Sequence, residues 1–370
     1  MKVLYIDWGY IHDCAIMRAF ENVGVEIVKV KVLKEELAES KQRMEEIVDG
    51  HTADIVFSVN FWKHLSNVCL EEGIPYCSWI LQLPNYDLYQ KEVRNLCNYI
   101  AVCDSYLTQK LLTQGIEKVF FLPDAIEKIS GQHNEPVYRG VCMIEKYPEQ
   151  VLQTKGMSLY SVGYLEACLH AQRVLCGDYI LENVLLDRVL RETTLINTIP
   201  EEIEEDNTRI YLADYYLAPT CTALRQSIFL NNYSNIMTIY SDGSFDDCNC
   251  ERHNMPETAE ERDKIYAEKE FTVVMPHYSL HNGIPRQMLE IVAAGGFPLC
   301  AMQKDYSYFF KNMENIACFR NFEEFQELLV KYGNNREERE RLRVALYNLV
   351  TEEHTYKNRI NHMIEMWGRY

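Results

Sequence analysis

The chain has 370 residues, of which 47% are hydrophobic, 25% charged and 12% aromatic. This length and composition exclude one small module and a disordered chain, and they favour two globular domains. The 37 basic and 55 acidic residues give a net charge of −18, which disfavours nucleic acid and anionic lipid as partners. Any anionic substrate therefore needs a few basic groups and helix N-termini gathered in one site.

The first third of the chain alternates short apolar runs with helical patterns. Apolar runs rich in β-branched residues predict strands at 3–6, 25–32, 55–59, 76–81, 98–102 and 119–122. Helical spacing predicts helices at 15–23, 34–48, 63–72 and 106–114. Strands that alternate with helices form a parallel sheet covered by helices. Residues 1–130 are therefore predicted to form a Rossmann-like domain.

Residues 127–136 lose both hydrophobicity and periodicity, which predicts a linker between two domains. The segment 150–205 is predicted to be mainly helical and to end in a solvated acidic run at 201–206. Further strands are predicted at 137–144, 236–240, 271–275 and 297–301, and helices at 217–231, 285–294, 322–332 and 336–350. The predicted fold class is α/β: two doubly wound domains, the second over 137–350 with a helical insertion.

The cysteine pattern bears on the cellular compartment. Thirteen cysteines are scattered through apolar runs without the regular spacing of a disulfide framework, which predicts reduced thiols in the core. The first residues, Met1 to Trp8, turn polar too soon for a signal peptide. No stretch approaches the roughly 18 apolar residues of a membrane span. We expect a cytoplasmic protein.

Two doubly wound domains in tandem predict a ligand in the crevice beyond the carboxyl ends of their strands. The G-x-G-x-x-G pattern of dinucleotide enzymes is missing after the first strand, and no G-x-x-x-x-G-K-[ST] loop occurs. A nicotinamide-dependent oxidoreductase is therefore a weak alternative, which NAD(P) binding would support.

The segment 281–299 carries the most informative motif. Pro285 suits the first position of a helix, and Gly295-Gly296 suit a left-handed stop after its end. Arg286 and Glu290 are four residues apart and share one face of this helix. One interpretation is a surface ion pair, although a cation near the positive end of the helix dipole is disfavoured. The other is a nucleotide-sugar site, in which Arg286 and backbone amides hold a pyrophosphate and Glu290 accepts ribose hydroxyls.

The chain resembles the spore-maturation-protein-like (CgeB-like) glycosyltransferases over nearly its whole length. The strongest part is the glycine-bounded helix 283–297. The resemblance also rests on Met1 to Tyr5 with Trp8, Pro75-Tyr76 to Trp79, Pro84, Gly163 to Glu166, Ala171-Gln172, Ile239 to Asp242, His354 to Tyr356 and Arg359. It implies the GT-B architecture: two Rossmann-like domains facing across a cleft, the donor held by the second and the acceptor by the first. It also implies that a last helix, within 351–370, crosses back to the first domain.

Carried over by position, the resemblance implies donor-binding roles around the same helix. Arg286 would face the diphosphate, Glu290 the ribose, and Gly283 and Ile284 would supply backbone near the phosphates. The other donor-binding candidates are Tyr240, Ser241 and Asp242 at a strand end, and Asn282. His281 lies just before the helix and is a catalytic candidate at the sugar or phosphate, with a structural role as the alternative.

Three departures from related chains are visible. Asn282 stands where many retaining relatives have a glutamate. Met143-Ile144 and Gln82-Leu83 stand where relatives often have Gly-Ser and an Asp before Ser-Pro. These positions leave open a second hypothesis, a catalytically inactive relative that binds a nucleotide sugar or a protein.

Candidates for acceptor binding lie in the first domain. Trp8 and Tyr10 follow a predicted strand and offer rings for an acceptor sugar, although core packing is the alternative for such residues. Gln82 is included for its position, and His12 or Asp13 would be the base if the reaction inverts. The acceptor would be a glycan, a protein or a small molecule.

The predicted reaction breaks the bond between an anomeric carbon and a phosphate, so the main task is to stabilise the leaving diphosphate. Retention would fit a front-face reaction in which that phosphate takes the acceptor proton. The segment Asp242 to Asp246 is interpreted as a loop, so we expect no required metal or other cofactor. Cys248-Asn249-Cys250 with His253 lacks an evident fourth ligand and is interpreted as a thiol-containing loop rather than a zinc site.

Overall fold

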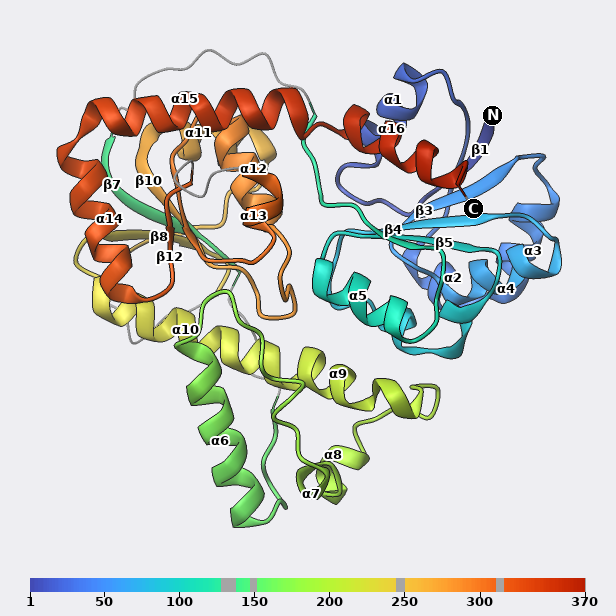
Figure 1. Cartoon of the computed structure of the whole chain (residues 1–370), viewed down its shortest axis with the longest axis horizontal. Helices are drawn as coiled ribbons and strands as arrows, with labels where there is room; N and C mark the ends of the chain where they lie inside the picture. Colours follow the sequence, from blue (N-terminus) through green and yellow to red (C-terminus); the bar gives the residue numbers. More distant parts are fainter. Residues whose placement is uncertain (128–137, 147–151, 244–249, 311–315, 370) are drawn as a thin grey trace. The chain divides into compact units, whose positions relative to one another are not determined.

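The structure is a computed structural model that describes residues 1–127, 138–146, 152–243, 250–310 and 316–369. The chain divides into two compact units, each with one six-stranded parallel sheet (Figure 1). The first unit comprises Met1–Glu127, Pro200–Thr208 and His354–Tyr370, and the second comprises Lys128–Ile199 and Arg209–Glu353. Nearly all of the predicted linker, 127–136, lies outside the described residues.

The first sheet has the strand order β2-β1-β3-β4-β5-β6. Its strands are β1 (Lys2–Asp7), β2 (Glu26–Lys31), β3 (Ile55–Val59), β4 (Tyr76–Ile80), β5 (Asn98–Val102) and β6 (Val119–Phe121). The central strands β3 and β4 are buried at every position, as continuous apolar runs in a parallel sheet require. The strands are added in one direction from β1 to β2 and in the other direction from β3 onward. Such folds bind ligands at this switch in strand order, between β1 and β3.

The helices of the first unit include one from the far end of the chain. They are α1 (Asp13–Asn22), α2 (Lys34–Glu39), α3 (Lys41–Asp49), α4 (Lys63–Glu71), α5 (Ser105–Thr113) and α16 (Tyr356–Trp367), with 3₁₀ turns at Tyr86–Tyr89, Lys91–Arg94 and Glu205–Asn207. Figure 1 shows α16, in red, beside α1, in blue. Tyr356, Ile360 and Met363 of α16 belong to the core that also contains Tyr5 and Trp79. The last helix therefore completes the first unit.

The second sheet has the order β9-β8-β7-β10-β11-β12. Its strands are β7 (Tyr138–Ile144), β8 (Met237–Ser241), β9 (Glu251–Asn254), β10 (Lys269–Val274), β11 (Pro298–Ala301) and β12 (Cys318–Phe319). In chain order this is the 3-2-1-4-5-6 arrangement of nucleotide-binding folds, and the reversal falls between β7 and β10. Together the two sheets confirm the predicted α/β class.

The helices of the second unit follow the predicted alternation. They are α6 (Leu159–Arg173), α7 (Asp187–Leu190), α8 (Thr193–Ile196), α9 (Thr208–Leu212, whose first residue belongs to the first unit), a π-helical turn at Ala213–Leu217, α10 (Ala218–Tyr233), α11 (Ala259–Glu268), α12 (Arg286–Ala293), α13 (Tyr306–Phe309), α14 (Phe322–Asn334) and α15 (Arg336–Glu353). Of the cysteines that the prediction placed in the core, Cys69, Cys77, Cys103, Cys168 and Cys300 are buried and Cys97 is half-buried.

Two predictions about local structure were wrong, and some elements were not predicted. The single helix at 34–48 is two helices, because the Ser40 hydroxyl accepts a hydrogen bond from Arg43 N–H, at 3.2 Å, and starts α3 as its N-cap. The strand β9 and the helix α11 were missed, since β9 is exposed at every position and shows no apolar alternation. The acidic run 201–206 is not a helix end; it leads into α9, and Glu204 pairs with Arg94 at 3.1 Å.

Candidate functional site

Helix α12 begins and ends near the predicted residues. Pro285 is its N-cap residue rather than its first residue, and its side chain offers no acceptor to the first turn. Gly295 follows the helix with φ 81°, in the left-handed conformation that was predicted. The predicted core face is buried, and it consists of Leu289, Val292 and Ala293. The helix is therefore fixed to the sheet along one side.

The start of α12 is tied to the carboxyl end of β7. The Gln287 side-chain amide donates a hydrogen bond to the backbone carbonyl of Ile144, at 2.6 Å. Ile144 ends β7 and pairs with Tyr240 of β8. Because the sheet reverses next to β7, this contact places the helix N-terminus at the ligand-binding edge of a doubly wound sheet.

Glu290 lies between two guanidinium groups. Arg286 Nε is 2.8 Å from Glu290 Oε1, and Arg262 Nε of α11 is 3.5 Å from Oε2. The side chains of Arg286, Arg262 and Glu290 are 21%, 19% and 17% exposed. The predicted Arg286–Glu290 pair is therefore formed, but it is largely buried and includes a third charge that the sequence analysis missed.

Two guanidinium groups and one carboxylate thus lie at the N-terminus of a helix, and the carboxyl of Asp263 on α11 is near Glu290 and Arg262. The helix dipole adds positive potential at that end, which favours an anion. A guanidinium presents several donors to a phosphate, and charge-assisted hydrogen bonds are the strong class. The arrangement is suited to holding a negatively charged group beside Arg286.

Three predicted donor-binding residues lie at the end of β8: Tyr240 and Ser241 are its last two residues, and Asp242 follows it. The Tyr240 ring is stacked on His253, with centroids 5.0 Å apart and an angle of 21° between the planes. Ser241 Oγ accepts a hydrogen bond from Gly243 N–H at 3.3 Å, and Asp242 is exposed. Asp246 and Cys248, named with the neighbouring loop, lie outside the described residues. Tyr240 pairs with Ile144 at the end of β7, and Ile144 is the residue whose carbonyl Gln287 contacts.

The residues just before α12 are held by their backbone. The carbonyl of Asn282 accepts a hydrogen bond from Asp305 N–H at 3.0 Å. Gly283 and Ile284 are buried. Their predicted roles near the phosphates stay predictions.

His281 lies inside the second unit. Its Nε2 is 2.7 Å from Asp214 Oδ1, which also accepts a hydrogen bond from the Tyr179 hydroxyl at 2.8 Å. The Tyr179 and His281 rings are 4.0 Å apart, and the His281 side chain is 0% exposed. The structure gives His281 a position that supports the loop before α12, and its catalytic role stays a prediction.

Glu145 lies at the same edge of the sheet and was not among the residues predicted from the sequence. It follows β7 directly, and its N–H donates to the Tyr240 carbonyl at 3.1 Å. Burial raises the pKa of its carboxyl to about 8, while Arg225 acts in the opposite direction. At neutral pH the group therefore carries a proton and can donate a hydrogen bond at this edge. Its position as the first polar residue after a buried strand was the available signal.

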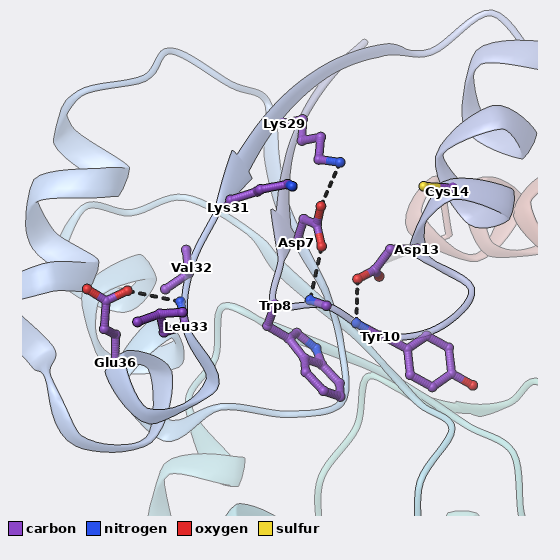
Figure 2. A pocket seen from close by; sticks show the side chains of 11 residues that line it. Asp7, Trp8, Tyr10, Asp13, Cys14, Lys29, Lys31, Val32, Leu33 and Glu36 are labelled. Carbon is purple, nitrogen blue, oxygen red and sulfur yellow. Dashed lines mark hydrogen bonds and ion pairs between the residues drawn. The ribbon is translucent and has the colours of Figure 1, made fainter. Parts of the chain in front are cut away.

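The first unit contains a pocket with a volume of about 420 Å³ at the carboxyl ends of β1 and β2. Trp8 and Tyr10 line it, as do Lys29 and Lys31 on β2 and Glu36 on α2. Figure 2 shows both lysines projecting from β2 on the side of Asp7. The Trp8 indole N–H donates to the Val59 carbonyl at 2.8 Å, which fixes the ring. The structure thus brings two of the four predicted acceptor-binding residues into one pocket.

The floor of this pocket holds two carboxyl groups with different protonation. Lys29 Nζ is 2.6 Å from Asp7 Oδ2. Although burial raises the pKa of Asp7, hydrogen bonds from Lys29, Asp13 and the Gly9 amide outweigh it and lower the pKa below its usual value. Burial raises the pKa of Asp13 to about 7, opposed by the hydrogen bond from Tyr5, at 2.6 Å. Asp7 is therefore the anion, and Asp13 is partly protonated at neutral pH.

The substitution Asp13→Asn tests this assignment through the pH dependence of stability. The native pKa of Asp13 lies above the unfolded value of about 3.9, so its contribution is fully present below about pH 4 and is lost as pH rises through about 7. The variant lacks this loss. Urea unfolding measures the free energy of unfolding of both proteins. Between pH 4.5 and 8, the difference in this free energy between wild type and variant should change by about 1–3 kcal/mol. The exposed Asp49→Asn variant is the control, and parallel pH curves for wild type and Asp13→Asn would contradict the assignment.

The other two predicted acceptor-binding residues lie outside this pocket. His12 is the N-cap residue of α1, with its ring 6.4 Å from that of Tyr356. Gln82 is exposed, and its Oε1 accepts a hydrogen bond from Asn60 Nδ2 at 2.9 Å. Asn60 has φ 61° and joins the ends of β3 and β4. Gln82 and Asn60 therefore form a second polar group along the same sheet.

The comparisons with known proteins concern the fold and the class of enzyme. Residues 237–365, roughly a third of the chain, match the model of a family described as glycosyl transferase-like. Sucrose-phosphate synthase from Thermosynechococcus elongatus is similar in structure, with 9% identity over 100% of this chain and 98% of that one and a TM-score of 0.50. An E. coli structure described as trehalose-6-phosphate with UDP-2-fluoro glucose is similar over 99% of both chains, with 9% identity and a TM-score of 0.50. No curated protein matches by sequence.

These findings confirm the predicted GT-B fold and the predicted class of enzyme, a glycosyltransferase. Among the described residues, no helix is both long and apolar enough to span a membrane. The matched region 237–365 includes Tyr240, Arg262, Arg286 and Glu290, and so it contains the charged cluster at the start of α12.

Proposed function

We propose that this glycosyltransferase takes a sugar from a nucleotide diphosphate sugar bound at the start of α12. The observation that carries the proposal is the contact between Gln287 and the end of β7, which holds the Arg286, Arg262 and Glu290 cluster at the topological reversal of the second sheet. A pyrophosphate there would meet a helix N-terminus and Arg286. Glu290, one turn further, would accept hydrogen bonds from ribose hydroxyls.

The proposed donor is a UDP-sugar. The E. coli protein with the same fold is described as bound with UDP-2-fluoro glucose, and this supports uracil as the base. Tyr240 and Ser241 at the end of β8 are the proposed contacts for the base. We also propose that the protein belongs to the CgeB-like group of glycosyltransferases and that it is cytoplasmic.

The proposed chemistry retains the configuration of the sugar and needs no metal. The bond from the anomeric carbon to the phosphate oxygen breaks, the acceptor oxygen bonds to the same carbon from the same face, and the acceptor proton passes to the leaving phosphate. Arg286 and the helix dipole compensate the charge that develops on the diphosphate. The proposed acceptor site is the pocket of the first unit, where Trp8 offers a ring and Asp7 and Lys31 offer hydrogen-bonding groups.

Thermal denaturation with UDP, GDP, ADP and UDP-glucose tests the donor site. A ligand at 100 times its Kd stabilises the native state by about 2.7 kcal/mol, so UDP and UDP-glucose should raise the Tm of the whole chain. UDP release from UDP-sugars, with and without cell-extract acceptors, then tests catalysis. Absence of any nucleotide effect would overturn the donor site, whereas UDP binding without UDP release would indicate a non-catalytic binding protein.

The substitution Glu290→Gln should raise the Kd for UDP roughly tenfold, because a carboxylate accepts stronger hydrogen bonds from ribose than an amide does. Arg286 and Arg262 remain, so binding of the phosphates should persist. Calorimetric titration with UDP measures binding of the whole nucleotide, and titration with uridine measures binding of the ribose and base without the phosphates. The exposed Glu337→Gln on α15 removes one carboxylate away from α12 and is the matched control. An unchanged Kd for UDP in Glu290→Gln would remove Glu290 from the ribose site.

A further inference from the structure

The second unit contains a separate cavity of about 220 Å³ whose charged lining is entirely basic. Its walls include Arg173, Arg225 and Arg320, together with the apolar side chains of Val174, Ile228 and Phe322. No carboxylate lines it among the described residues. The volume is below the roughly 300–1,000 Å³ of pockets for drug-sized ligands, so the cavity is suited to a small molecule.

Arg225 of α10 is the buried anchor of this cavity, with 4% of its surface exposed. One of its terminal nitrogens donates to the Pro276 carbonyl, and its guanidinium lies over the Tyr278 ring, 4.1 Å from the centroid. Its Nε is buried without an acceptor in the described part of the chain. The carboxyl of Glu145, on which Arg225 acts, has a pKa of about 8 and is therefore protonated at neutral pH. A buried guanidinium without a counter-charge is unfavourable, and holding one carbonyl does not require that charge.

Arg173 presents a second uncompensated charge to the same cavity. It is the last residue of α6, a position where the helix dipole favours a cation. Its Nε is also buried without an acceptor among the described residues. The dipole accounts for one arginine at a helix end, but it does not account for two arginines that line one cavity, where like charges repel.

Arg320 and the start of α14 complete the lining. Asn321 is the N-cap residue of α14, a helix of 13 residues, and Phe322 is its first residue. Glu324 is the nearby acidic group: its Oε2 accepts a hydrogen bond from the Arg320 N–H at 2.7 Å and is 3.9 Å from a terminal nitrogen of the same side chain. Arg320 is therefore partly compensated, and the excess positive charge resides on Arg173 and Arg225.

We propose that this cavity binds the phosphoryl group of a small molecule. Two guanidinium groups without an ion-pair partner among the residues that the structure describes match the charge of a phosphate dianion. Their planar sets of N–H donors can bond to several phosphate oxygens, whereas a single carboxylate has only two oxygens to accept them. The apolar walls would contact the remainder of a phosphate ester. The site shares no residue with the Arg286 and Glu290 cluster, although Arg225 also acts on the carboxyl of Glu145 at the end of β7.

The test is calorimetric titration of the whole chain with inorganic phosphate, phenyl phosphate and acetate at constant ionic strength. Wild type should bind both phosphates and not acetate, and Arg173→Gln should weaken phosphate binding about tenfold or more. Arg341→Gln removes one exposed guanidinium from α15 and should leave binding unchanged. Tighter binding of phenyl phosphate would identify an ester as the ligand, and equal binding would identify free phosphate.

Two further variants separate this proposal from the donor site. Arg286→Ala should keep phosphate binding, and Arg173→Gln should keep UDP binding, so either site can fail alone. Arg225→Lys keeps the charge but loses the planar donor set, and it should also weaken phosphate binding. If Arg225→Lys does not fold, the Arg173→Gln result decides. Failure of wild type to bind phosphate, or equal binding by wild type and Arg173→Gln, would overturn the proposal.

Discussion

Replacing Arg286 by alanine is expected to lower kcat/KM for the nucleotide sugar, which corresponds to a loss of about 2–4 kcal/mol of transition-state stabilisation. The reason is that the guanidinium would meet the charge that develops on the leaving diphosphate. The side chain is 21% exposed and held by Glu290 at 2.8 Å, so it is already oriented at the start of α12. The helix itself should persist, because an ion pair four residues apart contributes only about 0.2–0.5 kcal/mol. UDP release from UDP-sugars gives the kinetic measurement.

Two companion variants make the Arg286 result specific. Arg286→Lys keeps the charge but loses the paired donors, and it should recover only part of the activity. Arg341→Ala removes an exposed arginine elsewhere in the second unit and should leave kcat/KM unchanged. Kinetics of Arg286→Ala equal to those of wild type would show that this side chain has no part in donor binding or turnover.

The substitution Gly296→Ala is expected to destabilise the second unit by about 1–3 kcal/mol, the range for overpacking a core. A Cβ atom at this position would lie 2.6 Å from the backbone carbonyl oxygen of Tyr266 and 2.9 Å from Ile291 Cγ2. The carbonyl cannot rotate away as a side chain could, so α11 or the connection from α12 to β11 must shift. Denaturant unfolding followed by fluorescence measures the loss.

Gly333→Ala is the matched control for Gly296→Ala. Gly333 lies within α14, and a Cβ there would meet nothing within 4 Å. Alanine favours a helix by about 0.8–1.0 kcal/mol relative to glycine, so this variant should be as stable as wild type or more so. If Gly296→Ala matched Gly333→Ala in stability, the close approach of Gly296 to Tyr266 would not restrict the residue at this position.

The sequence predicted helix α12, at the proposed donor site, well because its signals are local. Pro285 and Gly295 delimit α12 through their own backbone preferences, and the apolar spacing defines the buried face. The pairing of Arg286 with Glu290 also follows from helical spacing. Arg262 was not predicted to join them, since it is 28 positions from Glu290 along the chain and belongs to a charged helix with little hydrophobic periodicity.

For the pocket of the first unit, the proposed acceptor site, the sequence predicted the aromatic lining residues but not the charged ones. Trp8 and Tyr10 follow β1 directly, and both line the pocket. Lys29 and Lys31 join them because β2 pairs in register with β1, Asp7 lying opposite Lys31. His12 and Gln82 lie elsewhere. His12 is part of the start of α1, and Gln82 is held by its hydrogen bond with Asn60, so the local structure after each strand decides where the side chain lies.

By itself the sequence determined two α/β sheets and the place of the main helix, because buried parallel strands need apolar runs and helix ends need particular backbone conformations. Only the tertiary structure decided which polar groups meet: Gln287 with the end of β7, His281 with Asp214, and Arg173 with Arg225 around one cavity. Such contacts join residues dozens of positions apart. They depend on how whole helices pack on a sheet, and no local periodicity records that packing.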